Sequence, residues 1–113
     1  MVFTAPRTYV GGELLTASIL NTDIRDNLNA LHDRIQSGTV SITPVANTPT
    51  SVTVTFPVAF ASTPRVIVSA ASGVVGSTVL GVGGDTETTT DFRATVYRTN
   101  TTLTTLRWIA FIP

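Results

Sequence analysis

The sequence predicts a mainly β protein, in which an N-terminal extended arm and one short α-helix precede a six-stranded antiparallel β-sandwich. Three observations support this prediction. From about Thr39 onward, apolar and polar residues alternate in short runs separated by turn residues, a pattern typical of strands. Threonine, whose branched side chain suits a pleated surface, accounts for 22 of the 113 residues. One stretch, residues 24–35, instead repeats its apolar residues with a helical period.

Residues 1–15 are expected to form the arm, because they have no apolar period and are interrupted by Pro6, Gly11 and Gly12. The first residues lack the charged-then-apolar layout of a secretory signal, so we expect no export by that route. No apolar run approaches the roughly 20 residues needed to cross a bilayer, so we expect no membrane insertion.

Residues 16–38 are expected to form the helix. Thr16 is a suitable N-cap, and Gly38 can take the left-handed conformation that ends many helices. Between them, apolar residues follow one another at spacings of 4, 3 and 4, the seam of a coiled coil: Ile24, Leu28, Leu31 and Ile35. A helix of about twenty residues is marginal alone in water. The seam must therefore pack against the chain's own β-domain or against copies of itself, and its narrowness favours copies.

Residues 39–113 are expected to form the sandwich. The predicted strands cover residues 40–42, 51–56, 66–69, 78–82, 92–97 and 106–112. No helical pattern separates them, which favours an antiparallel sandwich over a parallel sheet.

The last predicted strand is apolar on both faces. Trp108 alternates in phase with Leu106 and Ala110 and is expected in the core, whereas Ile109 and Phe111 point to the opposite face. A strand that is apolar on both faces is usually buried on both. We therefore expect Ile109 and Phe111 to pack against a neighbouring copy of the chain.

The charge and cysteine content exclude several classes of site. Seven arginines balance seven acidic residues and lysine is absent, so the surplus of positive charge that nucleic-acid binding needs is missing. The absence of cysteine excludes disulfides, thiolate zinc sites and cysteine nucleophiles. The single histidine, His32, is interpreted as a solvated helix residue. We predict no catalytic residue, no cofactor and no enzymatic activity.

Two further patterns have an ordinary structural interpretation. The glycines of 73–77 and 81–84 are not followed by Lys-Ser/Thr, so we interpret them as hairpin turns rather than phosphate loops. Asp85, Glu87 and Asp91 could offer oxygen ligands to Ca²⁺, but their spacing does not match a calcium-binding loop. A solvated hairpin is the favoured interpretation, with no metal.

The N-terminal part of the chain resembles an opening module of virion proteins of tailed bacteriophages and prophages. The resemblance rests on residues 6–17, 20–22 and 24–31, with Tyr9 where that module usually has tryptophan. It implies a virion protein, assembled in the host cytoplasm, whose N-terminus attaches to other virion proteins. The implied attachment residues are Pro6, Arg7, Tyr9 and Val10.

The β-region resembles the H-type lectin fold, a six-stranded antiparallel sandwich that assembles as trimers. This resemblance rests on Val54-Thr55-Phe56-Pro57 with Phe60, on residues 64–69 and on Trp108-Ile109-Ala110. The loop that holds sugar in those lectins corresponds to residues 99–102, which lack its aromatic and histidine side chains, so no sugar-binding residue is carried over.

Taken together, the two resemblances imply a homotrimeric structural protein of a phage virion. The appendage is expected to be a tail fibre or baseplate adhesin, or a fibre or decoration on the capsid. The trimer interface is expected to comprise Ile24, Leu28, Leu31, Ile35, Ile109 and Phe111. The alternative is a carbohydrate-binding, lectin-like module that recognises a glycan on the host surface.

Overall fold

The computed structural model of the chain describes residues 5, 7–8 and 10–113. It divides into two compact units, residues 1–34 and Ile35–Pro113. No helix in the described part of the chain is long and apolar enough to span a membrane.

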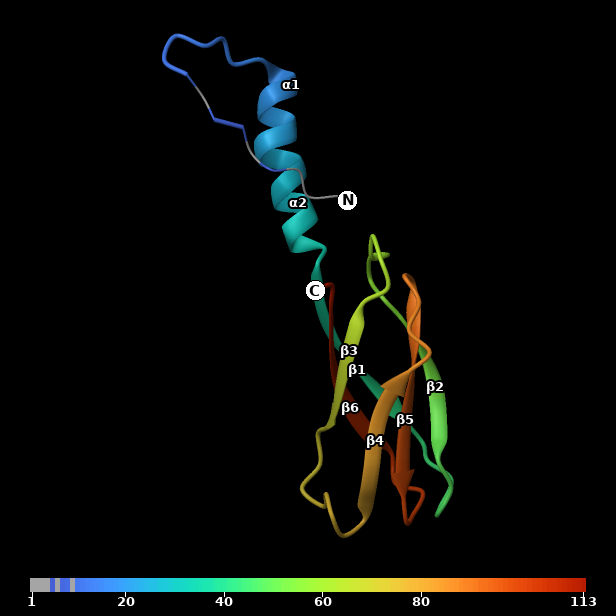
Figure 1. Cartoon of the computed structure of the whole chain (residues 1–113). Helices are drawn as coiled ribbons and strands as arrows, with labels where there is room; N and C mark the ends of the chain where they lie inside the picture. The colour runs from blue at the N-terminus through green and yellow to red at the C-terminus, as the bar shows by residue number, and fades with distance from the viewer. Residues whose placement is uncertain (1–4, 6, 9) are drawn as a thin grey trace. The chain divides into compact units, whose positions relative to one another are not determined.

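The N-terminal unit contains one continuous helical stretch. It consists of α1 (Ala17–Leu20), a π-helical segment η1 (Asn21–Asp26) and α2 (Asn27–His32) (Figure 1). The side chain of Thr16 accepts a hydrogen bond from the Ile19 N–H at 3.2 Å, so the predicted N-cap is confirmed. Within the stretch, the Asn27 amide donates to the Asp23 carbonyl at 3.2 Å.

The predicted C-terminal end of the helix is wrong. The helix ends at His32, and residues 35–38 belong to the first strand, β1 (Ile35–Ile42). Gly38 does not end a helix; it pairs with Trp108 in the sheet, where a Cβ would lie 2.8 Å from Cζ2 of the indole. The β-unit therefore begins at Ile35 rather than Thr39, because the chain enters the sheet ladder as soon as Asp33 and Arg34 have completed a turn.

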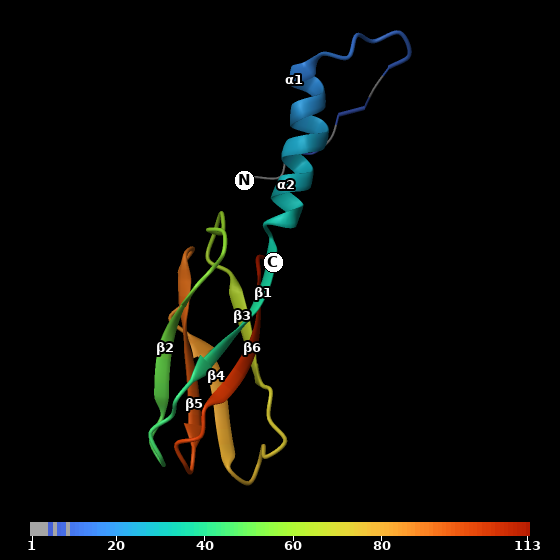
Figure 2. The same cartoon turned by 180° about the vertical axis from the view of Figure 1, so that it is seen from behind.

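The predicted six-stranded antiparallel fold is confirmed. β1 is followed by β2 (Thr50–Thr55), β3 (Arg65–Ala70), β4 (Val79–Asp85), β5 (Asp91–Arg98) and β6 (Thr104–Phe111). They form two three-stranded sheets, β1-β6-β3 and β2-β5-β4, in which every neighbouring pair is antiparallel. Figure 1 and, from behind, Figure 2 show β5 in the middle of one sheet and β6 in the middle of the other.

The chain crosses between the sheets repeatedly. Only β4 and β5 follow one another within a sheet; the chain changes sheet after β1, after β2, after β3 and after β5. β6 pairs with β1 from Ile35↔Phe111 to Ile42↔Thr104, and with β3 from Arg65↔Phe111 to Ala70↔Leu106. The first and last strands of the sandwich are therefore neighbours.

An aromatic cluster forms the centre of the core between the sheets. The rings of Phe56 and Phe60 meet edge to face with centroids 4.9 Å apart, and those of Phe92 and Trp108 lie 5.6 Å apart. Trp108 is buried, as predicted. Burying each such side chain contributes about 1.5–3 kcal/mol. Because these inward residues fill the core, the sandwich residues that remain for function lie on its two outer faces and in its loops.

Candidate functional site

The helix carries a stripe of uncovered apolar side chains. Ile24, Leu28 and Leu31, here called the helical stripe, are 52%, 60% and 49% exposed. Leu20, one turn earlier, is also exposed. The fourth predicted seam residue, Ile35, is not on the helix, because it is the first residue of β1.

The outer face of the β1-β6-β3 sheet carries a second apolar surface. Ile35 lies opposite Phe111 across the β1–β6 ladder, and Ile109 lies opposite Ile67 across β3–β6. Three of these residues are exposed, and Phe111 is half-buried. We call Ile35, Ile67, Ile109 and Phe111 the outer patch.

Ile67 was not predicted as part of this surface. The signal was present, because Val66, Ile67 and Val68 make the third strand apolar on both faces, as in β6. Only the register shows that Ile67 faces the same way as Ile109 and lies beside it.

The arm residues described by the structure form a closed turn. The Val10 N–H donates to Glu13 Oε2 at 3.1 Å, and the Glu13 N–H donates to the Val10 carbonyl at 3.0 Å. Gly12 has a φ of +81°, which glycine adopts at little cost, and Arg7 forms an ion pair with Glu13. Val10 is 71% exposed. Pro6 and Tyr9, the other predicted attachment residues, lie outside the described residues.

The predicted acidic cluster is divided among different partners. Asp85 binds Arg93, and Asp91 accepts the Thr88 hydroxyl at 3.0 Å. In the described part of the chain, no group of three side chains is arranged to hold a metal. His32, considered from the sequence, is exposed and bonds to Asp33. In the 99–102 loop, Asn100 accepts a hydrogen bond at 2.5 Å from the buried Arg98, which also donates to Thr104 at 3.0 Å.

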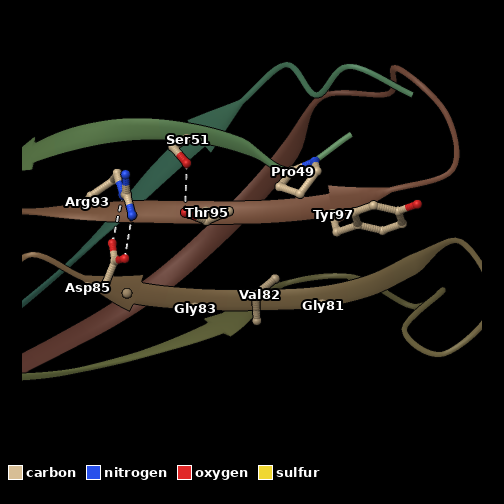
Figure 3. A pocket seen from close by; sticks show the side chains of 10 residues that line it. Pro49, Ser51, Gly81, Val82, Gly83, Asp85, Arg93, Thr95 and Tyr97 are labelled. Atoms are coloured by element: carbon tan, nitrogen blue, oxygen red, sulfur yellow. Dashed lines mark hydrogen bonds and ion pairs between the residues drawn. The ribbon is translucent and has the colours of Figure 1, made fainter. Parts of the chain in front are cut away.

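The outer face of the β2-β5-β4 sheet contains a groove of about 550 Å³. Its floor includes Gly81 and Gly83 of β4, which lie opposite Tyr97 and Thr95 of β5. Figure 3 shows Tyr97 at one end of the groove, Asp85 and Arg93 at the other, and Pro49 and Ser51 along the β2 side. None of these residues was predicted to form a site, because the β4–β5 register brings them together.

A bidentate ion pair closes one end of the groove. Arg93 Nε donates to Asp85 Oδ1 at 2.8 Å and Nη2 donates to Oδ2 at 2.5 Å. The hydrogen bond from Arg93 lowers the pKa of Asp85, and the same bond raises the pKa of Arg93. Both groups are therefore ionised at neutral pH, and their charges compensate each other.

Comparison with known proteins identifies the sandwich. A family model described as "Putative tail fiber protein gp53-like, C-terminal" matches residues 35–111, which is more than half of the chain. The match begins at the first residue of β1 and ends at the last residue of β6. No curated protein matches the chain.

The family match confirms the expectation of a phage tail fibre-type protein and indicates a component of the virion. The family is one of structural fibre proteins, which agrees with the expectation that the chain is not an enzyme. The chain therefore belongs to the family of gp53-like tail fibre proteins, whose C-terminal domain corresponds to its β-sandwich.

Proposed function

We propose that this chain is a homotrimeric appendage of the phage virion. The N-terminal arm docks on another virion protein, the helical stripe joins three copies in a short coiled coil, and the sandwich is displayed. The family match supports a place on the tail rather than a decoration on the capsid.

The observation that carries this proposal is the exposure of two separate apolar surfaces in a single chain. The helical stripe and the outer patch each consist of large aliphatic or aromatic side chains on regular elements, where a partner of the same shape can pack. Stripes with this spacing associate as coiled coils. At about 25 cal/mol per Å² of apolar surface, burying a few such side chains per subunit stabilises the assembly by several kcal/mol.

The test is the mass of the full chain in solution, measured by multi-angle light scattering at micromolar concentration. We expect three times the 11.9 kDa of one chain. The variant Leu28→Asp places a charge in the helical stripe and should dissociate the trimer. Asn29→Asp, which adds the same charge at an exposed neighbour outside the stripe, should not. A monodisperse wild-type monomer contradicts the proposal.

The proposed attachment role of the arm is tested on virus particles. Electron microscopy of particles labelled with gold-tagged antibody against the sandwich should place the label on the tail. Particles made with a chain that lacks residues 1–15 should be unlabelled, although the truncated chain remains trimeric. Label on the capsid, or normal incorporation without the arm, contradicts this part of the proposal.

A second candidate function is carbohydrate recognition, and the groove on the β2-β5-β4 sheet favours it. The 99–102 loop offers less support, because Asn100 is already engaged by the buried Arg98. The six-stranded sandwich agrees with the architecture of H-type lectins, and we retain that relationship as a proposal about the fold.

A further inference from the structure

Gly83 in β4 has no explanation inside the subunit, and Gly81, which adjoins the β-bulge after Val79, also has open space beside it. A Cβ added to Gly81 or Gly83 would meet nothing within 4 Å, and neither residue has a positive φ. Gly84 differs, because its Cβ would lie 3.0 Å from Val68 Cγ2 in the core. Glycine weakens the interior of a strand, and it often marks a place where a ligand or another backbone approaches closely.

The surroundings of these glycines form a built groove. Tyr97 lies beside Gly81, and the Asp85–Arg93 pair lies two residues beyond Gly83 along β4 (Figure 3). Along the β2 side, the hydroxyls of Ser51 and Thr95 are hydrogen-bonded at 2.8 Å. The groove is shallow and open to solvent, with a volume of about 550 Å³.

We propose that this groove binds a neutral oligosaccharide of the host surface. A sugar ring would stack on Tyr97 and lie over the bare backbone of Gly81 and Gly83, while its hydroxyl groups would bond to Asp85 and Arg93. This assignment deepens the carbohydrate recognition proposed above and rests on it.

The chemistry of the groove fits a saccharide. A sugar has apolar C–H faces and hydroxyl edges, and the groove offers an aromatic face together with planar hydrogen-bonding groups. The carboxylate supplies acceptors and the guanidinium supplies donors in fixed planes. Their charges compensate each other, so the groove selects neither an anion nor a cation.

A second copy of the chain fits the groove less well. The cores of subunit interfaces are rich in large apolar side chains, whereas glycine and polar residues line much of this groove. The outer patch lies on the other sheet, and the outer faces of a two-layer sandwich point in opposite directions. Copies packed on the outer patch, as the proposed trimer requires, would leave the groove facing outward.

The experiment measures binding of the full-length chain to an array of immobilised neutral and acidic oligosaccharides, followed by titration calorimetry with the best ligand. Gly83→Val fills the groove with a residue that suits a strand, and Tyr97→Ala removes the stacking surface. Each should weaken binding at least about tenfold. The melting temperature of Gly83→Val should not fall. Gly73→Val, at a loop glycine that also has open space around it, should bind like the wild type.

The outcomes separate this inference from the proposed assembly. Wild-type trimers that bind no oligosaccharide on the array overturn the groove assignment and leave the trimer intact. Full affinity in both groove variants also overturns it, because the sugar then binds elsewhere. A change in mass for Gly83→Val identifies the groove as a contact between copies and overturns it as well. If the wild-type chain is monomeric and binds an oligosaccharide, and Gly83→Val abolishes that binding, the groove assignment is supported and the trimer is contradicted.

Discussion

Gly38 lies where β1 passes directly over the indole of Trp108. The ring is held from other sides by Phe56 and Phe92, with centroid distances of 5.7 and 5.6 Å. Its Nε1 is buried and has no hydrogen-bond partner among the described residues. The indole therefore has little freedom to move away from β1.

Gly38→Ala should destabilise the sandwich. Replacing glycine by alanine in a strand ordinarily stabilises by about 0.5–1 kcal/mol. Here the new Cβ would lie 2.8 Å from Trp108 Cζ2, so we expect a loss of about 1–3 kcal/mol from overpacking. Chemical denaturation followed by tryptophan fluorescence measures it. Gly73→Ala, where a Cβ meets nothing, is the matched control, and equal stability of the two variants would show that β1 can shift away from the ring.

The Asp85–Arg93 ion pair makes the stability of the sandwich decrease at low pH. Arg93 holds the pKa of Asp85 below the 3.8 of an unperturbed aspartate. The pair's contribution to stability is therefore present above pH 3.8 and is lost as the pH falls through the lower folded-state pKa. Arg93→Gln should raise the pKa of Asp85, as measured by NMR titration of its carboxyl carbon. An unchanged pKa would show that the ion pair does not persist in solution.

The groove residues could not be predicted because no local pattern joins them. Gly81 and Gly83 looked like turn residues in the sequence, and Tyr97 looked like an ordinary strand residue. They become neighbours only through the pairing of Gly81 with Tyr97 and of Asp85 with Arg93. By contrast, the burial of Trp108 followed directly from its alternation with Leu106 and Ala110.

At the scale of elements, the two ends of the helix differ in how well the sequence defined them. Thr16 was identified correctly because N-capping depends on local geometry. The other end was misplaced because Ile35 continues the helical repeat, whereas in β1 it lies on the exposed face, opposite to the apolar alternation of Val40 and Ile42. Ile35 belongs to the strand because it pairs with Phe111 of β6, 76 positions later. A short stretch of sequence around Ile35 does not contain that pairing.

Thr16→Ala should weaken the start of the helix. The variant loses the hydrogen bond from the Ile19 N–H, and removing such a cap costs about 1 kcal/mol. We expect lower ellipticity at the helical band and faster hydrogen exchange of the Ser18–Leu20 amides. Thr16→Ser retains the hydroxyl and should restore both. Identical exchange in all three proteins would show that the cap does not limit opening of α1.

At the scale of the whole molecule, the number of strands and the antiparallel class followed from alternation and turn residues. The order of the strands did not, because β1 and β6 become neighbours through contacts that are remote in sequence. The family match covers the sandwich alone, so the proposed assembly rests on the exposed apolar surfaces.

If assembly buries the outer patch, the stability of the protein depends on its concentration. Unfolding of a trimer releases separate chains, so the melting temperature of the wild type should rise with protein concentration. Ile109→Asp places a charge in the outer patch and should reduce this dependence. Thr39→Asp, on the same sheet and exposed but outside the patch, is the control. A melting temperature that is independent of concentration in the wild type contradicts trimer assembly.

The position of β6 has a consequence for biosynthesis. It is the last of the six strands to leave the ribosome, yet it lies in the middle of its sheet and joins β1 to β3. Until Thr104–Phe111 has emerged, neither of those strands has its partner, so a nascent or prematurely terminated polypeptide cannot close the sandwich. Only chains completed through Phe111 can therefore pair all three strands of this sheet.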